Sequence, residues 1–435
     1  MPWDFNNYYS HNMDGLISKL KLSKTESDKL KALRQIVRER TRDVFQEARQ
    51  VAIDVRRQAL TLESVRLKLE KTNVRYLSPE ERADLARLIF EMEDEARDDF
   101  IKFQPRFWTQ GSFQYDTLNR PFHPGQEMDI DDGTYMPMTV FESEPSIGHT
   151  LLLLLVDTSL KSLEAENDGW VFEEKNTCGR IKIYREKTHI DVPMYAIPKE
   201  QFQKKQTAAD SAHLIKSDSV FESFALNRGG REAYAVESDK VNLALREGVR
   251  RWSVSDPKIV EDWFNESCKR IGGHLRSVCR FMKAWRDAQW EVGGPSSISL
   301  MTAVVNILDR ESHNGSDLTG TMKLIARLLP EEFNRGVESP DDTDEKPLFP
   351  AESNHNVHHR AIVETMEGLY GILLAAEQSE SREEALRKIN EAFGKRVTNA
   401  LLITSSAAAP AFLNAPSKEP SSKPIEVVNK NWPPR

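Results

Sequence analysis

The hydrophobic positions of the first hundred residues predict two helices. One of them is expected from residue 78 to about residue 97. Ser78 can cap this helix, Pro79 suits its first turn and Glu81 can complete a capping box. Before it, residues 24–58 predict one long amphipathic helix, since apolar residues recur there at helical spacings of three and four. These residues are Leu30, Leu33, Val37, Val44, Ala48, Val51 and Val55.

From Phe107 onward the pattern changes to short alternating runs with aromatic and β-branched residues, interrupted by Gly and Pro. This texture predicts a sheet, with neighbouring strands at residues 170–174, 180–185 and 189–195. The apolar run 151–156 is too short to cross a bilayer and predicts a buried helical segment.

Helical spacing returns at Asp256-Pro257, and Gly293 to Ser296 form a turn before a buried helix at 298–308. An acidic, Pro-containing loop is expected at 338–350. We therefore predict an α+β fold with four regions. They are N-terminal helices with the long spine helix at 1–105, a sheet core at 106–250, a helical lobe at 251–404, and a flexible tail at 405–435.

Composition narrows the class of protein. Hydrophobic residues make up 39% and charged residues 29%, as in an ordinary globular protein. The net charge of -8 argues against obligate nucleic-acid binding, which favours a basic surface. Cys178, Cys268 and Cys279 form no zinc motif and suit reduced thiols, and the N-terminus lacks the features of a secretory signal. A cytoplasmic protein without a membrane anchor is expected.

Three aspartates carry the candidate chemistry. If residues 128–131 form a strand, its period of two places Asp129 and Asp131 on one face and Ile130 in the core. Two adjacent carboxylates are costly unless a cation lies between them, and Mg²⁺ bridging to substrate phosphates is the usual solution. Asp191 lies in an apolar strand, where an unpaired charge is also costly, so we expect it at the same site.

Such a carboxylate set can hold two metal ions, one activating an attacking hydroxyl and one neutralising a leaving pyrophosphate. Just before it, Gly111 lets backbone approach a triphosphate, and Ser112 offers its hydroxyl and a nearby N–H to phosphate oxygens. Each signal alone is weak, but the order of Gly-Ser, strand Asp-x-Asp and a later strand Asp is specific.

This ordered set resembles the nucleotidyltransferases of the polymerase-β type and, among them, the bacterial cGAS/DncV-like family. Residues 107–117, 128–138, 178–180, 188–198 and 281–299 carry the likeness, which weakens over 208–237 and after about 351. The resemblance implies a polymerase-β-type core with a mixed sheet, and a helical lobe that closes the nucleotide cleft.

The resemblance also implies roles for single residues. Asp129, Asp131 and Asp191 are the expected ligands of two Mg²⁺ ions, or of Mn²⁺, and Asp191 is also expected to take the proton of the attacking ribose hydroxyl. The expected nucleotide contacts are Gln110, Gly111, Ser112 and Lys283 with Ser297 at the triphosphate, Tyr115 stacked on a base, and Arg180, Ser255 and Asp344 elsewhere on the nucleotide. Plainer alternatives are a solvated charge at Lys283, a helix cap at Ser297, a packed aromatic at Tyr115 and one acid of an acidic loop at Asp344.

The implied reaction joins ATP and GTP through a linear dinucleotide into 3′,3′-cyclic GMP-AMP, a second messenger of antiphage defence that a downstream effector senses. The resemblance further suggests that conjugation machinery joins the tail to a partner; a plain extension is the alternative. Other outcomes of the same chemistry are another cyclic oligonucleotide, or nucleotidyl transfer to RNA or protein. A non-catalytic nucleotide sensor is less compatible with three repelling carboxylates.

A second anion site is suggested by Arg34, Arg38 and Arg42, which recur every four residues and form a basic stripe. Arg106 and Trp108 can join it. A polyanionic aromatic metabolite could bind there and regulate activity. The alternative is a solvated helix on which these arginines pair with acidic neighbours, namely Glu39, Asp43 and Glu47.

Overall fold

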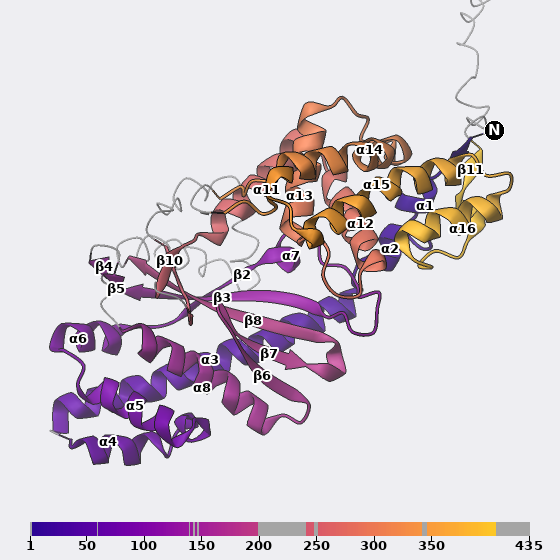
Figure 1. The fold of residues 1–435 in the computed structure, drawn as a ribbon. Coiled ribbons are helices and arrows are strands. Elements are labelled where there is room, and N and C mark those ends of the chain that lie inside the picture. Colours follow the sequence, from indigo (N-terminus) through magenta and orange to yellow (C-terminus); the bar gives the residue numbers. More distant parts are fainter. Residues whose placement is uncertain are drawn as a thin grey trace, which may run out of the picture.

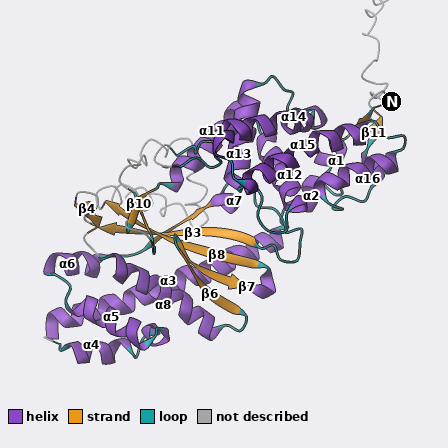
Figure 2. Cartoon of the chain, in the orientation of Figure 1, coloured by secondary structure: helices purple, strands orange, loops and turns teal. Residues whose placement is uncertain are grey.

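A mixed sheet separates two groups of helices in the computed structural model (Figure 1). The structure describes residues 2–58, 60–138, 140–141, 144–145, 148–198, 241–247, 251–341 and 346–405. Figure 2 shows most strands gathered in the middle, with the helices of residues 24–102 and 149–166 on one side and the C-terminal helices beyond the other. The α+β class, the mixed sheet, the long N-terminal helix and the helical C-terminal lobe predicted from the sequence are confirmed.

Within the described part of the chain, seven strands form the sheet, and β8 (Thr188–Pro198) lies at its centre. It runs parallel to β3 (Met128–Met138) and antiparallel to β7 and β9. The remaining strands are β2 (Arg106–Gln110), β6 (Trp170–Lys175), β7 (Cys178–Ile183), β9 (Asn242–Ala244) and β10 (Trp252–Val254). All three predicted neighbouring strands are confirmed, but the second lies two residues earlier because residues 184–186 form a 3-10 turn, η2 (Tyr184–Glu186), that ends in left-handed Lys187.

One face of the sheet is covered by the helices of residues 24–102 and by α8 (His149–Glu166), whose residues 151–156 are largely buried as predicted. The long helix α3 (Lys24–Gln58) is confirmed at its predicted bounds, and its apolar face is buried. The other members of this layer are α4 (Leu62–Leu69), η1 (Asn73–Tyr76), α5 (Pro79–Phe90) and α6 (Asp94–Lys102).

The helix predicted for residues 78 to about 97 is wrong at its C-terminal end. The capping box of Ser78 and Glu81 is present, but α5 ends at Phe90 and α6 begins a new helix at Asp94. The buried guanidinium of Arg97 donates hydrogen bonds to the carbonyls of Ile89, Phe90 and Met92. These bonds satisfy carbonyls that a continuous helix would otherwise use, and so they stabilise the break.

The C-terminal lobe consists of helices, and two of them begin where helix starts were predicted: Asp256 caps α11 (Pro257–Ile271) and Ser296 caps α13 (Ser297–Arg310). The lobe also contains α12 (His274–Gln289), α14 (Leu318–Arg335), η5 (Glu352–Asn354), α15 (Val357–Glu377), α16 (Arg382–Phe393) and η6 (Ala400–Leu402). Between α3 and the lobe, the short helix α7 (Gly111–Gln114) follows β2 directly.

Residues from the very start of the chain pack in this lobe. The helices α1 (Asn6–Ser10) and α2 (Leu16–Leu20) share its hydrophobic core, and β1 (Trp3–Asp4) pairs with β11 (Thr404–Ser405). A further small pair joins β4 (Val140–Phe141) to β5 (Glu144–Pro145). The predicted division of the chain at 105, 250 and 404 stays a prediction, and the expected flexible tail lies beyond the described residues except for Ser405.

Among the described residues, none of the helices combines the length and the apolar character that a bilayer crossing requires.

Candidate active site

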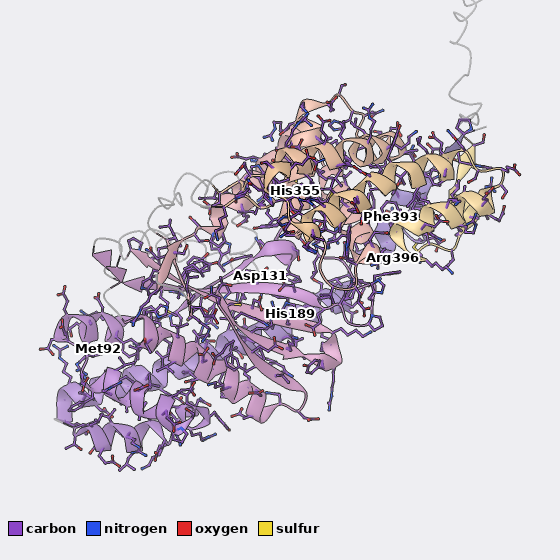
Figure 3. The ribbon with its side chains drawn as sticks, viewed as in Figure 1. Met92, Asp131, His189, His355, Phe393 and Arg396 are labelled. Atoms are coloured by element: carbon purple, nitrogen blue, oxygen red, sulfur yellow. The ribbon has the colours of Figure 1, made fainter. Side chains whose placement is uncertain are left out.

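The predicted aspartates meet on one face of the sheet. In the parallel pair of β3 and β8, Asp129 lies opposite His189 and Asp131 lies opposite Asp191. The intervening Ile130 is fully buried in the core, so the predicted alternation along this strand is confirmed. Figure 3 shows Asp131 and His189 on the part of the sheet that lies toward the helical lobe. The three carboxylates and one imidazole therefore share a single site.

Asp191 has a partner that the sequence pattern did not indicate. Arg180 lies opposite it on antiparallel β7 and donates to its two carboxylate oxygens from Nε at 2.6 Å and Nη2 at 2.7 Å. Arg180 therefore compensates the charge of Asp191 in this structure, and the expected place of Asp191 at a cation site stays a prediction. Arg180 itself was expected at a nucleotide, but in this structure it binds Asp191 and is not among the described residues that line the adjoining cavity.

Gly111 makes close packing at Asp131 possible. It has a left-handed φ of 64°, and a Cβ atom at this position would lie only 2.1 Å from Oδ2 of Asp131. Glycine was expected here for the approach of a triphosphate, whereas the contact that demands it in this structure is with the Asp131 carboxylate. Any larger residue would displace that carboxylate.

The environment of Asp131 disfavours a third negative charge. Burial, followed by the charges of Asp129 and Asp191, raises the pKa of Asp131 to about 8. A protonated Asp131 is thus the stable form at neutral pH until positive charge arrives.

The residues present fit a divalent cation. One ligand atom each from Asp129, His189 and Asp191 lies within 4.8 Å of the others. Asp129 Oδ1 and His189 Nε2 are both buried and lack a hydrogen-bond partner among the described residues, although they are 3.0 Å apart. The distance between these two atoms fits an ion pair, but the two side chains are not oriented for a hydrogen bond. A cation between them would satisfy both atoms.

A cavity of about 670 Å³ opens between this face and the helical lobe. Nine of the predicted site residues line it: Gln110, Gly111, Ser112, Tyr115, Asp129, Asp131, Ser255, Lys283 and Ser297. Asp344 lies outside the described residues, and Asp341 lines the cavity nearby. The structure therefore brings most of the predicted nucleotide contacts together around one space.

Several lining side chains are held in place by neighbours. Gln110 accepts a hydrogen bond from the hydroxyl of Tyr195 at 3.2 Å. The Lys283 ammonium donates to the carbonyl of Thr117 at 2.8 Å, and burial, followed by the charge of Arg286, lowers its pKa to about 8. Lys283 is therefore not the solvated charge that was considered as an alternative.

Ser297 is also not a helix cap, because Ser296 occupies that position. Its hydroxyl instead accepts a hydrogen bond from Nη1 of Arg286 at 2.8 Å. The ring of Tyr115 packs against Phe264, with 5.9 Å between ring centroids, and also lines the cavity. Tyr115 can therefore both pack against Phe264 and contact a nucleotide in the cavity.

Several lining residues were missed in the sequence, and the ionisable ones among them include Glu127, His189 and Arg286. Signals for two of them were present. His189 precedes Asp191 by two residues and so shares its face of the strand, and Arg286 follows Lys283 by one helical turn. Neither signal indicates what the side chain would meet.

The basic stripe of α3 contacts the sheet. The buried Arg34 donates to the hydroxyl of Thr109, and Arg38 donates to both carboxylate oxygens of Asp132 at 2.6 and 2.7 Å. The guanidinium of exposed Arg42 lies 4.9 Å from the ring centroid of Phe107. Arg34 and Arg38 thus do not belong to a solvated surface.

Arg106 and Trp108, the two further residues predicted for the second anion site, both lie on β2. Arg106 is exposed, and Trp108 donates a hydrogen bond from Nε1 to the buried Glu261 at 3.3 Å.

Two family models match the chain. Residues 105–195 match the nucleotidyltransferase domain of DncV-like cyclic GMP-AMP synthase, and residues 272–406 match the C-terminal domain of cyclic GMP-AMP synthase. The chain is 80% identical to a cyclic GMP-AMP synthase of Escherichia coli (strain TW11681), with 98% of each chain covered. It is 61% identical to that of Vibrio cholerae, again with 98% of each covered.

Solved structures of the same family are similar to this chain. Escherichia coli DncV bound to 3′-deoxy GTP has a TM-score of 0.84 and 91% identity, covering 93% of this chain and 100% of that one. A mutant Vibrio cholerae di-nucleotide cyclase with ATP, GTP and 5MTHFGLU2 has a TM-score of 0.87 and 60% identity, covering 93% and 100%. Vibrio cholerae DncV with the linear intermediate 5′ pppA(3′,5′)pG has a TM-score of 0.85 and 60% identity, covering 93% and 98%. The resemblance noted in the sequence is confirmed: the chain belongs to the DncV-like family of cyclic GMP-AMP synthases and is a nucleotidyltransferase.

Proposed function

We propose that the chain joins ATP and GTP into 3′,3′-cyclic GMP-AMP in two nucleotidyl transfers at one site. The observation that carries this proposal is the convergence of Asp129, Asp131 and Asp191 on neighbouring strands, where Asp129 and Asp131 line a cavity together with Lys283 and Ser112. The names of the relatives and the linear dinucleotide bound to one of them support the choice of product.

In the first transfer, the 3′-hydroxyl of ATP attacks the α-phosphate of GTP. A P–O bond forms, the bond to pyrophosphate breaks, and Asp191 takes the hydroxyl proton. Two Mg²⁺ ions, or Mn²⁺ in their place, held by the three aspartates would activate the hydroxyl and neutralise the leaving pyrophosphate. In this proposal Lys283 and Ser112, which line the cavity, hold the phosphates in line, together with Gln110, which accepts a hydrogen bond from Tyr195.

In the second transfer, the linear dinucleotide turns around in the same cavity. Its free 3′-hydroxyl on the guanosine then attacks the α-phosphate of the adenosine end. A second pyrophosphate leaves and the ring closes. The same carboxylates serve both transfers, because each is an in-line attack on an α-phosphate.

Chain-terminating substrates test the order of the transfers. With ATP and 3′-deoxy GTP, the linear dinucleotide should accumulate with one pyrophosphate and no cyclic product, because the second attacking hydroxyl is missing. With 3′-deoxy ATP and GTP, this dinucleotide should not form. Accumulation of a linear product only in the second mixture would contradict the order, and labelled RNA or protein would support the alternative of transfer to a macromolecule.

Metal binding should depend on pH through Asp131. Because the pKa of this carboxyl is raised to about 8, a cation must displace its proton below that pH. We expect metal affinity to rise by up to about tenfold per pH unit between about pH 6 and about pH 8 and then to level off. Calorimetric titration with Mg²⁺ measures this. Constant affinity over the range would contradict the account.

The raised pKa of Asp131 also determines how the stability of the metal-free protein changes with pH. The folded state holds the Asp131 proton more tightly than the unfolded state does, so this carboxyl stabilises the metal-free protein at low pH. That contribution should be lost as the pH rises from about 4 to about 8, and added Mg²⁺ should restore it.

A role in antiphage defence, with the product activating a separate effector and the tail joined to a partner by conjugation machinery, is proposed on the family resemblance. The bond that would join the tail lies outside the described residues.

We also propose a regulatory ligand site around Arg42, with Arg106 and Trp108 on neighbouring β2. The complex of a relative with 5MTHFGLU2 supports a second ligand besides the nucleotides. Arg42→Glu is the sharpest probe, because Arg42 is exposed, whereas Arg34 is buried and Arg38 is partly buried. We expect it to leave the basal rate unchanged and to weaken binding of 5MTHFGLU2 by about tenfold or more, as a calorimetric titration measures. Equal affinity of both proteins for this molecule would contradict the proposed site.

A further inference from the structure

His189 occupies a position that the three-aspartate account leaves unexplained. It lies on β8 directly opposite Asp129 and is only 8% exposed. Its Nδ1 is 2.9 Å from Oε2 of Glu127, and its Nε2 is 3.0 Å from Oδ1 of Asp129. The His189 imidazole thus lies between Glu127, which is not one of the three predicted metal ligands, and Asp129, which is.

The two contacts of the ring differ in kind. The Nδ1 contact is a hydrogen bond, whereas Nε2 and Asp129 Oδ1 are both buried without a hydrogen-bond partner among the described residues. If Nδ1–H donates to Glu127, the neutral ring presents a lone pair at Nε2. A lone pair and a carboxylate oxygen repel each other at this distance unless positive charge lies beside both.

We propose that His189 is a nitrogen ligand of the metal centre, and that Glu127 fixes the tautomer and orientation of its ring. A carboxylate that accepts from the second ring nitrogen is the usual support of a metal-binding histidine. The proposal rests on the proposed function, since the metal centre belongs to it. It adds a fourth residue, with a nitrogen ligand, to a site otherwise composed of carboxylates.

A proton can occupy the same place when metal is absent. Burial lowers the pKa of His189, but the neighbouring Asp129 carboxylate offsets this, and the net shift is upward. In the metal-free protein an imidazolium between Glu127 and Asp129 therefore competes with the cation.

The nitrogen ligand has a consequence for metal selectivity. Mg²⁺ prefers oxygen ligands, whereas imidazole binds Mn²⁺ and later transition metals well. We therefore expect the centre to bind Mn²⁺ more tightly than Mg²⁺, and His189 to be responsible for much of the difference.

Pulsed electron paramagnetic resonance of the full chain loaded with Mn²⁺ alone tests the proposal. A directly bound imidazole should give nitrogen modulation of the Mn²⁺ echo, and protein made with ¹⁵N-histidine should shift it to the ¹⁵N pattern. This labelled wild-type comparison requires no variant to fold. His189→Gln should lose the modulation, while the exposed His358→Gln should keep it.

Affinities provide the second readout. His189→Gln should weaken Mn²⁺ binding by about 10–100-fold and Mg²⁺ binding much less. Glu127→Gln retains an acceptor for Nδ1–H, so it should keep the nitrogen modulation and weaken Mn²⁺ binding only slightly.

The outcomes separate this inference from the proposed function. Mn²⁺ that binds the wild type, is lost in Asp129→Ala and shows no nitrogen coupling would overturn the role of His189 and leave the carboxylate centre standing. Mn²⁺ binding that is the same in wild type and Asp129→Ala would overturn the metal centre itself.

Discussion

Replacing Asp129 and Asp131 together by alanine is expected to reduce dinucleotide formation by roughly 10³-fold or more, because the reacting hydroxyl and the leaving pyrophosphate both lose their charge compensation. The rate of pyrophosphate release from ATP and GTP in Mg²⁺ measures the effect. Residual activity within tenfold of the wild type would contradict the assigned role of these carboxylates.

The loss must be separated from unfolding. Removing these two carboxyl groups should not lower the thermal midpoint of the metal-free protein, since without a cation the charge of Asp129 opposes the ionisation of Asp131 there. Asp168→Ala is a matched control, because the Asp168 side chain is 91% exposed in an ion pair with Arg185. It should keep both the activity and the midpoint of the wild type.

Replacing Arg246 by alanine is expected to cause the largest loss of stability. Arg246 follows β9 and donates to both carboxylate oxygens of Asp157, at 2.5 and 2.8 Å, and Asp157 is only 3% exposed in the middle of α8. The variant leaves a buried carboxylate without its partner, and such changes destabilise proteins by about 3–5 kcal/mol. The free energy of unfolding in urea measures this.

A matched surface variant gives the contrast. Arg185→Ala breaks an exposed ion pair with Asp168, and such pairs contribute little to stability. Its unfolding curve should overlay that of the wild type. Equal stability of Arg246→Ala and Arg185→Ala would show that the buried pair does not hold α8 to the sheet.

Local patterns were enough to predict much of this molecule. The helical spacing of α3 and the alternation around Ile130 each depend on residues close together in sequence, where periodicity alone decides which face is buried. The capping boxes and the Pro and Gly signals likewise act within one turn. These features predicted the long helix, the central strands and the shared face of Asp129 and Asp131.

Contacts between distant segments could not be predicted in the same way. The pairing of Arg180 with Asp191, and of His189 with Asp129, depends on the register between strands, which no single strand encodes. The break after α5 depends on Arg97 reaching back to carbonyls of the preceding helix. Packing of α1 and α2 in the C-terminal lobe has no local signal at all.

The most direct test is to incubate the purified full chain with Mg²⁺, ATP and GTP, identify every product by mass and count the pyrophosphate released. The account predicts one dominant product with the mass of cyclic GMP-AMP, two pyrophosphates for each molecule of it, and no product without the divalent ion. Nucleotides that remain intact under these conditions, or a product formed equally well in a metal chelator, would contradict it.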